Sequence, residues 1–381
     1  MKIIRIIRIV FFMIWIVMIG CREPYNPPEL KQSPNYLVVD GFLNSAGPST
    51  ILLSRTRGLN DSLPNMPEDG AQVSVTGSQG ETYYLQGTGS GTYRFDSLPL
   101  SPFEIYKLQI TTSNGQKYIS DSISVLQTPS IDSLNWKQDT TGPDSKLGVN
   151  IYVTTHDPSS TYGYYRWEYQ ETWKYRSAYE SYYIYANGSL TPRNADQQVY
   201  YCWHDEPSTS LVIGSTYQLS QNLIFEQPVI FIPQGSEKIS IKYSILVTQF
   251  SISKTAYEYW QNLQQTTELT GSIFDPLPSQ VTGNLHNISN PNEPVIGFIS
   301  ASSANSQRIF ISNTQVKHWG YLYGKGCQEI IISPSQFDTY FGSGGYIPTG
   351  SKGISDVGAT TPSCGDCTTK GGSNTQPAFW Q

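Results

Sequence analysis

Two residue types in this sequence could carry metal or nucleophilic chemistry, the histidines and the cysteines. The four histidines are His156, His204, His286 and His318, and none belongs to an H-E-x-x-H motif or another paired metal-ligand spacing. Two of them precede an aspartate, but neighbouring side chains on a strand point to opposite faces. No G-x-S-x-G nucleophile motif occurs. The sequence therefore predicts no catalytic residue, no metal site and no cofactor, and we expect a protein that is not an enzyme.

The five cysteines fall into two groups with different expected chemistry. Cys21 follows Gly20 and an apolar run, which is the cleavage pattern of bacterial lipoproteins, so we expect lipidation at Cys21. The even number of remaining cysteines is typical of disulfides in an exported chain. Two of them form a C-x-x-C pair, but no second such pair or paired histidines point to zinc. The candidates for two disulfides, with three connectivities open, are Cys202, Cys327, Cys364 and Cys367.

Residues 1–20 have the layout of a signal peptide. Three basic residues precede an uncharged apolar run at residues 9–19. That run is shorter than the roughly 20 residues that a membrane-spanning helix needs, and it fits the apolar core of a signal peptide. Residues 21–35 hold four prolines, which favour an extended, semi-rigid tether. We therefore expect a mature chain bound to a lipid bilayer through acylated Cys21.

The composition is typical of a secreted β protein. The formal net charge of -6 argues against a nucleic-acid partner. Charged residues make up 14% of the chain, against about 25% in typical soluble domains. Aromatic residues reach 13% and include 27 tyrosines. This balance predicts a mainly β fold.

Two β-rich domains are expected after the tether. Residues 36–128 contain short strand patterns separated by Gly, Pro, Asn and Asp, which is typical of an Ig-like β-sandwich. Residues 131–381 contain longer strand patterns and predict a larger domain of the β-sandwich type. One helix is expected inside this domain, at about 254–268, where large apolar residues recur at helical spacing. Ser253 directly precedes it and is a residue type favoured as an N-cap.

The clearest alternating segment is residues 163–176. Five of its aromatic residues point to one face of the predicted strand, and Tyr164 with the polar residues points to the other. We expect the aromatic face to fill the core, although aromatic rings can also stack against a ligand. The members of this face are Tyr165, Trp167, Tyr169, Trp173 and Tyr175.

A second group of tyrosines follows without strict alternation and lies next to an Asn-Gly turn at 187–188. We expect these rings in an exposed loop. Tyrosine offers contact area at low entropic cost, so the loop is a candidate contact for a ligand or partner. The candidates are Tyr179, Tyr182, Tyr183 and Tyr185.

The C-terminal tail, residues 342–381, is rich in Gly, Ser and Thr and ends in Phe379-Trp380-Gln381. Burying two large aromatic rings would contribute several kcal/mol at roughly 25 cal/mol per Å². Ordering costs about 1–2 kcal/mol per residue, so disulfides must hold most of the segment. We expect an irregular, disulfide-bonded tail whose last aromatic residues lie against the second domain.

Several segments resemble the lipoproteins of Bacteroidota that are grouped as the domain-of-unknown-function 4249 family. The similarity begins with Cys21 and the segment PYNP that follows it, and continues through LVVDGFL and YCW. It extends through KYSILVTQFSISKTAYEYWQNL, GSIFDPLPSQVTGNLHN, NPNEPVIGFISAS and RIFI to the final CGDCTTKGG and PAFW. The resemblance covers nearly the whole mature chain.

The resemblance implies a non-enzymatic lipoprotein anchored in the outer membrane. It also implies a partner, because such proteins are commonly encoded beside TonB-dependent receptors, so we expect help with ligand binding or uptake. A cell-surface adhesion or envelope-assembly protein without a transporter partner is the alternative. Only Glu23 among the first residues after Cys21 is acidic. The resemblance therefore leaves open whether the protein faces the cell surface or the periplasm.

Overall fold

The computed structural model describes residues 35–57, 66–140, 146–267 and 283–381. Cys21, the predicted signal peptide and nearly all of the predicted tether lie outside these residues. The chain is mainly β, as the sequence predicted. Among the described helices, none has the length and apolarity needed to cross a membrane.

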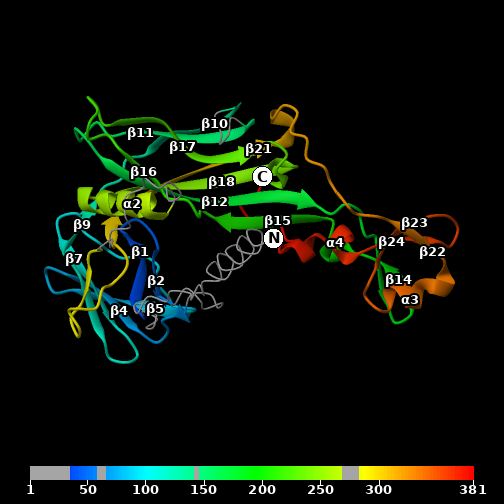
Figure 1. Ribbon diagram of the computed structural model, residues 1–381, viewed down its shortest axis with the longest axis horizontal. Helices are drawn as coiled ribbons and strands as arrows, with labels where there is room; N and C mark the ends of the chain where they lie inside the picture. Colours follow the sequence, from blue (N-terminus) through cyan, green and yellow to red (C-terminus); the bar gives the residue numbers. More distant parts are fainter. Residues whose placement is uncertain (1–34, 58–65, 141–145, 268–282) are drawn as a thin grey trace, which may run out of the picture.

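Eleven strands join into the first sheet, which lies at the lower left of Figure 1. Its hydrogen-bonded order is β7-β4-β5-β6-β2-β1-β20-β9, and β9 pairs again with β7, so eight strands close into a barrel-like ring. The strands are β1 (Leu37–Asn44), β2 (Ser49–Arg55), β3 (Met66–Pro67), β4 (Gln72–Gly77), β5 (Thr82–Gly89), β6 (Thr92–Phe95), β7 (Ile105–Thr111), β8 (Lys117–Ser120), β9 (Ile123–Leu126), β19 (Leu285–Asn287) and β20 (Ser300–Ser302).

The core of this ring is formed by side chains at alternate positions along its strands. Buried and less buried residues alternate along β2 and β7, so every second side chain points inward. The sequence predicted a sandwich of two sheets here, whereas the pairing gives one sheet that closes on itself. The sheet closes because β20, at residues 300–302, lies between β1 and β9 and pairs with both of them in parallel. No pattern within residues 36–128 could indicate that strand.

The second body contains a three-stranded and a five-stranded sheet (Figure 1). One cluster of buried residues includes members of both sheets and forms a common core. The predicted aromatic face of residues 163–176 belongs to that cluster, which confirms its core role. The strands are β10 (Ile131–Asp139), β11 (Gly148–His156) and β17 (Leu223–Pro233) in one sheet, and β15 (Tyr201–Pro207), β12 (Tyr164–Arg176), β18 (Lys242–Ser251), β21 (Ala304–Ser312) and β16 (Val212–Ser215) in the other.

The predicted helix is confirmed as α2 (Lys254–Thr267). Ser253 caps it, because its hydroxyl accepts a hydrogen bond from the backbone N–H of Ala256 at 3.1 Å. The buried face of α2 packs against the end of β18, and the ring of Tyr259 lies 5.3 Å from that of Phe298. Figure 1 shows α2 between the first sheet and the second body.

A separate group of short elements projects from the second body at the right of Figure 1. We call it the distal lobe. It combines a hairpin from the chain between β12 and β15 with a three-stranded sheet from the C-terminal region, around its own small core. Its elements are β13 (Tyr183–Ala186), β14 (Ser189–Pro192), β22 (Ile330–Ile332), β23 (Ile347–Ser351), β24 (Val357–Thr360) and α3 (Phe337–Phe341). The remaining short helices are η3 (Ala195–Gln197), η4 (Glu237–Ile239), η5 (Asn313–Gln315), η6 (Pro334–Gln336), α4 (Pro362–Gly365) and η7 (Cys367–Lys370).

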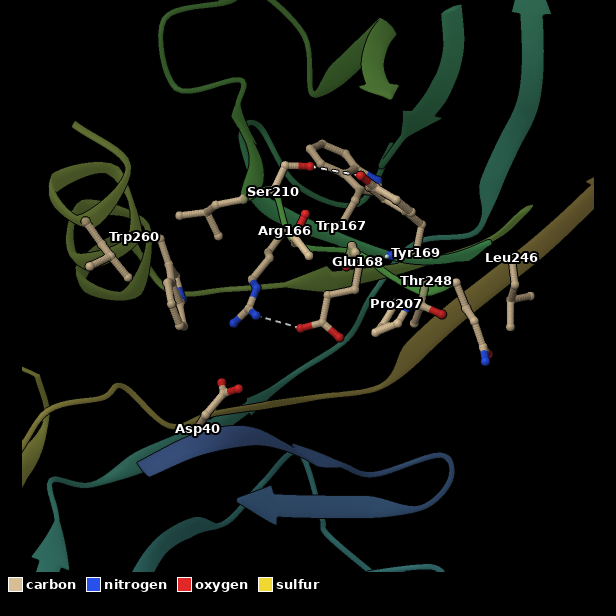
Figure 2. A pocket seen from close by; sticks show the side chains of 15 residues that line it. Asp40, Arg166, Trp167, Glu168, Tyr169, Pro207, Ser210, Leu246, Thr248 and Trp260 are labelled. Atoms are coloured by element: carbon tan, nitrogen blue, oxygen red, sulfur yellow. Dashed lines mark hydrogen bonds and ion pairs between the residues drawn. The ribbon is translucent and has the colours of Figure 1, made fainter. Parts of the chain in front are cut away.

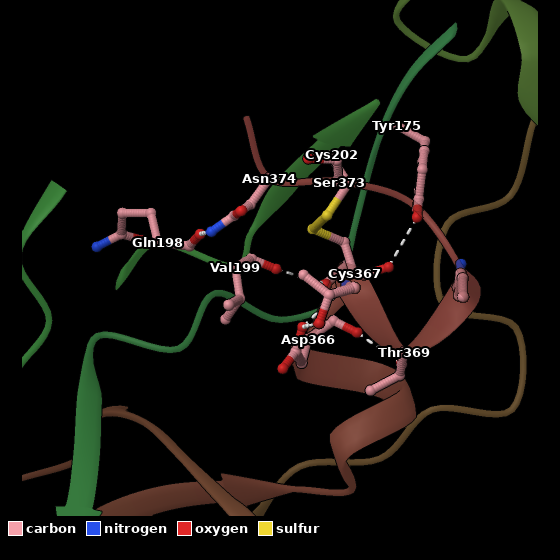
Figure 3. The surroundings of a disulfide bond; sticks show 12 residues. Tyr175, Gln198, Val199, Cys202, Asp366, Cys367, Thr369, Ser373 and Asn374 are labelled. Atoms are coloured by element: carbon pink, nitrogen blue, oxygen red, sulfur yellow. Dashed lines mark hydrogen bonds between the residues drawn. A yellow bond between two sulfur atoms is a disulfide. The ribbon is translucent and has the colours of Figure 1, made fainter. Parts of the chain in front are cut away.

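Two disulfides are present, as predicted, and the structure resolves their connectivity. Cys202 on β15 bonds to Cys367, and Cys327 bonds to Cys364. The two cysteines of the C-x-x-C pair therefore hold different parts of the chain. Around the first disulfide, the hydroxyl of Tyr175 donates to the carbonyl of Cys367 at 2.7 Å (Figure 3). Burial raises the pKa of Tyr175 to about 12, so this hydroxyl remains a donor at neutral pH.

The C-terminal tail follows the second body, and its last aromatic residue is docked, as predicted. Trp380 is 8% exposed and its ring lies 6.3 Å from Trp203 on β15 and 5.6 Å from Phe310 on β21. The expectation of an irregular tail was wrong in part, because residues 347–351 and 357–360 form β23 and β24. β24 is made of small or β-branched residues that are all buried, so its strand forms through tertiary pairing.

The first sheet, which we call the first body, is joined to the second body by two strands that follow each other almost directly in the chain. β20 belongs to the first sheet, β21 belongs to the five-stranded sheet, and only Ser303 separates them. The hydroxyl of Thr128 accepts a hydrogen bond from the backbone N–H of Ser251 at 2.9 Å at the same junction. The domain boundary between residues 128 and 131 stays a prediction, and the structure adds that residues 285–302 contribute β19 and β20 to the first sheet.

Candidate ligand-binding cleft

A cavity of about 530 Å³ lies where the first sheet, the five-stranded sheet and α2 meet (Figure 2). Its floor is the outer face of β12 and β18, and one wall is α2. The loop between β15 and β16 forms the opposite wall, and Asp40 on β1 faces the floor. The cleft therefore needs contributions from segments that lie far apart in the sequence.

An ion pair forms the charged part of the floor. Arg166 and Glu168 are two residues apart on β12, so both side chains point away from the core. Nη2 of Arg166 lies 2.6 Å from Oε1 of Glu168. The guanidinium also lies 4.0 Å from the centre of the Trp260 ring on α2, a cation–π distance. These two contacts fix the guanidinium between the helix and the strand.

The acidic charge across the cleft is Asp40. Its side chain is exposed and lies on the opposite side of the cleft from the ion pair (Figure 2). Among the described residues, no basic group forms an ion pair with Asp40. The Nε of Arg166 is buried and has no hydrogen-bond partner in the described part of the chain. The cleft thus contains charged groups that the fold leaves incompletely paired.

Hydroxyl groups line the wall formed by residues 207–211. The hydroxyl of Ser208 accepts a hydrogen bond from the backbone N–H of Tyr169 at 3.3 Å, and the Tyr169 and Ser210 hydroxyls lie 2.9 Å apart. Burial raises the pKa of Tyr169, which keeps its hydroxyl protonated. The side-chain amide of Gln264 on α2 donates to the carbonyl of Leu211 at 2.9 Å. These bonds hold the wall against both β12 and the helix.

The lining of the cleft combines polar groups with an apolar surface. Its groups are an arginine–glutamate pair, an exposed carboxylate, a row of hydroxyls, and the apolar surfaces of Trp260 and Leu263. Such a mixture of apolar lining and few placed polar groups is typical of small-molecule sites. The lining residues include no histidine or cysteine.

The tyrosines proposed as contacts lie in the distal lobe and not in the cleft. Tyr182 is 50% exposed, and its hydroxyl donates to Glu180 at 2.8 Å. Tyr183 and Tyr185 bond through their hydroxyls to Ser351 and Asp338 inside the lobe. Tyr179 lies at the base of the lobe, where its backbone N–H donates to the carbonyl of Cys364. Their role as ligand or partner contacts stays a prediction.

The histidines occupy separate places. His156 and His286 each lie beside an aspartate, Asp132 at 2.7 Å and Asp121 at 2.9 Å. The His204 ring lies 4.6 Å from that of Trp173. Within the described ranges, no group of three or more His, Cys, Asp or Glu residues could hold a metal ion.

The cleft residues were not singled out from the sequence. Arg166 and Glu168 stood on the polar face of a predicted strand, and that face was the only signal available. Trp260 is one of the apolar residues whose helical spacing predicted α2, but that spacing does not indicate its contact with Arg166. Asp40 carries no local signal, because its role depends on how the first sheet lies against the second body.

One family model, described as "Domain of unknown function (DUF4249)", matches residues 22–308. The matched range includes every residue that lines the cleft. It ends before β22, β23 and β24 of the distal lobe. No curated protein matches the chain.

Proposed function

The chain belongs to the family described as domain of unknown function 4249, and on that premise we propose that it is an outer-membrane lipoprotein that assists a TonB-dependent receptor. In this role it has no enzymatic activity of its own, and acylated Cys21 anchors it to the bilayer. It binds a ligand, or supports the uptake of one, in the cleft between its two bodies.

The cleft is the observation that carries the proposal. Arg166 is held by Glu168 and Trp260, while Asp40 faces them from another sheet. Polar groups held in this way favour recognition, because their positions are fixed before a ligand arrives. β20 of the first sheet and β21 of the five-stranded sheet, which pair with strands that line the cleft, are separated only by Ser303.

Residues 1–21 support the proposed location in the outer membrane. The signal-peptide layout and Gly20-Cys21 favour lipidation, and the two disulfides suit an oxidising compartment. One acyl chain binds a membrane only marginally, so stable anchoring needs the several chains of a bacterial lipoprotein. We also propose that the second body is of the β-sandwich type, which its common core supports.

Co-purification tests the receptor partnership. The full-length chain, tagged at its C-terminus and expressed in its native host, is extracted in mild detergent after brief cross-linking. We expect a TonB-dependent receptor to be recovered in stoichiometric amount. The Cys21→Ala variant is the matched control, since loss of the anchor should reduce recovery of the receptor.

Two results would contradict the proposal. Recovery of the protein without any receptor, from cells that express TonB-dependent receptors, would reject the partnership. Recovery of adhesion or envelope-assembly components instead would support the alternative function, in which no transporter takes part.

A further inference from the structure

We propose that the cleft recognises its ligand through a protonated amine, held between Asp40 and Glu168. This inference rests on the proposed role of the cleft as a ligand site. It adds the chemical class of the ligand, which neither the family description nor the fold provides.

The first argument is the charge of the lining. Three charged residues line the cleft, Arg166, Glu168 and Asp40. Arg166 and Glu168 form a close ion pair and largely cancel each other. Asp40 therefore leaves a formal charge of about -1 facing the cavity, and a cation of the ligand would balance it.

The second argument is the fixed position of the arginine. Stacking on Trp260 at 4.0 Å and the 2.6 Å contact with Glu168 hold the guanidinium on the floor of the cleft. Asp40 stays without a basic partner in the described residues, although a cation lies across the cavity. A ligand amine could occupy the intervening space and contact the Asp40 carboxylate directly.

The third argument is the number of oxygen atoms in the cleft that can accept hydrogen bonds. An ammonium group carries three donors and no acceptor, so it needs several oxygen atoms around it. The Glu168 side chain is partly exposed, and its ion pair with Arg166 is made through Oε1. Asp40, Glu168 and the hydroxyls of residues 208–210 all line the same cavity. The apolar surfaces of Trp260 and Leu263 would contact the uncharged part of the ligand.

Isothermal titration of the purified mature protein tests this inference with matched probes. Glucosamine, N-acetylglucosamine and glucuronate share a pyranose ring and differ in charge. A lysine tripeptide with blocked ends, compared with its Nε-acetylated form, presents the same ammonium on a peptide. We expect the amine of one pair to bind at least tenfold more tightly than its acetylated partner, and that pair identifies the source as amino sugar or peptide.

Asp40→Asn should abolish the preference for the amine. The matched control is Asp96→Asn, because Asp96 is an exposed aspartate directly after β6 that does not line the cleft. Unchanged circular dichroism of both variants shows that they fold. Tighter binding of glucuronate, equal affinities within both pairs, or an amine preference that survives Asp40→Asn would overturn the inference. Receptor recovery is measured separately, so loss of the partnership and loss of amine recognition are distinguishable.

Discussion

Glu171 is a carboxylate on the inner, aromatic face of β12, and its side chain is 3% exposed. Nζ of Lys238 lies 2.6 Å from one of its oxygens, and the hydroxyl of Tyr243 donates to the other at 2.7 Å. Burial, with the neighbouring Glu171, raises the pKa of Tyr243 well above its ordinary value, so this hydroxyl remains a donor. The buried charge is therefore paired and hydrogen-bonded.

We expect Glu171→Gln to lower the free energy of unfolding by about 3 kcal/mol, because it removes one partner of a buried ion pair. Glu206→Gln is the matched control, since Glu206 contacts the same lysine at 2.8 Å but is 43% exposed. Its effect should stay below about 1 kcal/mol. Urea denaturation measures both variants, and equal effects would show that burial of Glu171 contributes nothing.

Lipidation is the second prediction at this scale. Cys21→Ala should abolish incorporation of a clickable fatty-acid probe, because the thiol at this position is the expected acceptor. Metabolic labelling followed by gel fluorescence measures it, with Cys327→Ala as a control that keeps the signal peptide intact. Equal labelling of wild type and Cys21→Ala would reject the lipoprotein assignment.

Single residues differ in how far the sequence indicated their roles. The aromatic residues of β12 were placed in the core because strict alternation is a local signal. Glu171 is in phase with them, yet its partner Lys238 comes from η4, and no local pattern links the two. The disulfide connectivity was likewise open, because spacing does not define which cysteines meet.

At the scale of elements, the last residues of the chain cover part of the outer face of the five-stranded sheet. Trp380 lies against Trp203 and Phe310, and Cys202 holds the preceding segment through its disulfide with Cys367. The backbone of Trp203 also pairs with Ser373. The tail is therefore both covalently and noncovalently attached to β15.

Trp380→Ala should lower the stability of the second body by about 2 kcal/mol, the approximate contribution of burying a large apolar side chain. Deletion of residues 377–381 should have at least the same effect. Phe379→Ala is the control, because Phe379 is 39% exposed and its main contact is the guanidinium of Arg308. Thermal unfolding measures the three variants, and an unchanged melting profile after the deletion would show that the tail contributes no stability.

We expect the distal lobe to lose stability at low pH, because Glu329 becomes protonated there. Burial opposes ionisation of this carboxyl, but hydrogen bonds from Lys352 and Thr349 outweigh it and lower its pKa. A lowered pKa in the folded state gives stability that is present above the unfolded pKa of about 4.3. That stability is lost as the pH falls through the folded value.

Hydrogen exchange of lobe amides between pH 7 and pH 3 tests this expectation, after correction for the intrinsic exchange rates. Glu329→Gln should reduce lobe stability at pH 7 by about 1–2 kcal/mol and flatten its acid dependence. Asp196→Asn removes an exposed acid of η3, which follows the β13–β14 hairpin of the lobe along the chain, and should leave both unchanged. If Glu329→Gln keeps the acid dependence of the wild type, another group is responsible.

Elements with their own periodicity were predicted well, and elements that depend on distant partners were not. α2 begins at the predicted residue and extends to Thr267, the last described residue before 283, because helical spacing and an N-cap serine are local signals. β24 was missed, since residues 357–360 are small and become a strand only between β22 and β23. The two-sheet sandwich expected for residues 36–128 was wrong for the same reason, because β20 closes the ring.

At the scale of the whole molecule, the first sheet is completed by β19 and β20. These two strands come later in the chain than β12 and β18, the central strands of the five-stranded sheet. Leu285, Val295, Ile299 and Ala301 belong to the core cluster of the first sheet. β20 also closes the ring between β1 and β9. Asp40, which lies on β1 next to β20 in this sheet, lines the cleft on the side opposite Arg166.

We expect a fragment of residues 35–128 not to fold cooperatively, because it lacks β19, β20 and four core residues. The same fragment joined by a Gly/Ser linker to residues 283–303 should recover a cooperative transition. Circular dichroism and the dispersion of amide NMR signals measure both. Cooperative unfolding of the short fragment would support the predicted domain boundary at residue 128 as a folding boundary.

The position of β1 determines how the molecule responds to mechanical load. β1 lies between antiparallel β2 and parallel β20, so tension applied to the chain before Leu37 pulls along the strand. Such a pull shears both rows of hydrogen bonds together instead of opening them one at a time. Because β20 continues through Ser303 into β21, part of the load passes directly into the five-stranded sheet. A pull on the chain before Leu37 is therefore resisted first by the hydrogen bonds that β1 makes with β2 and β20.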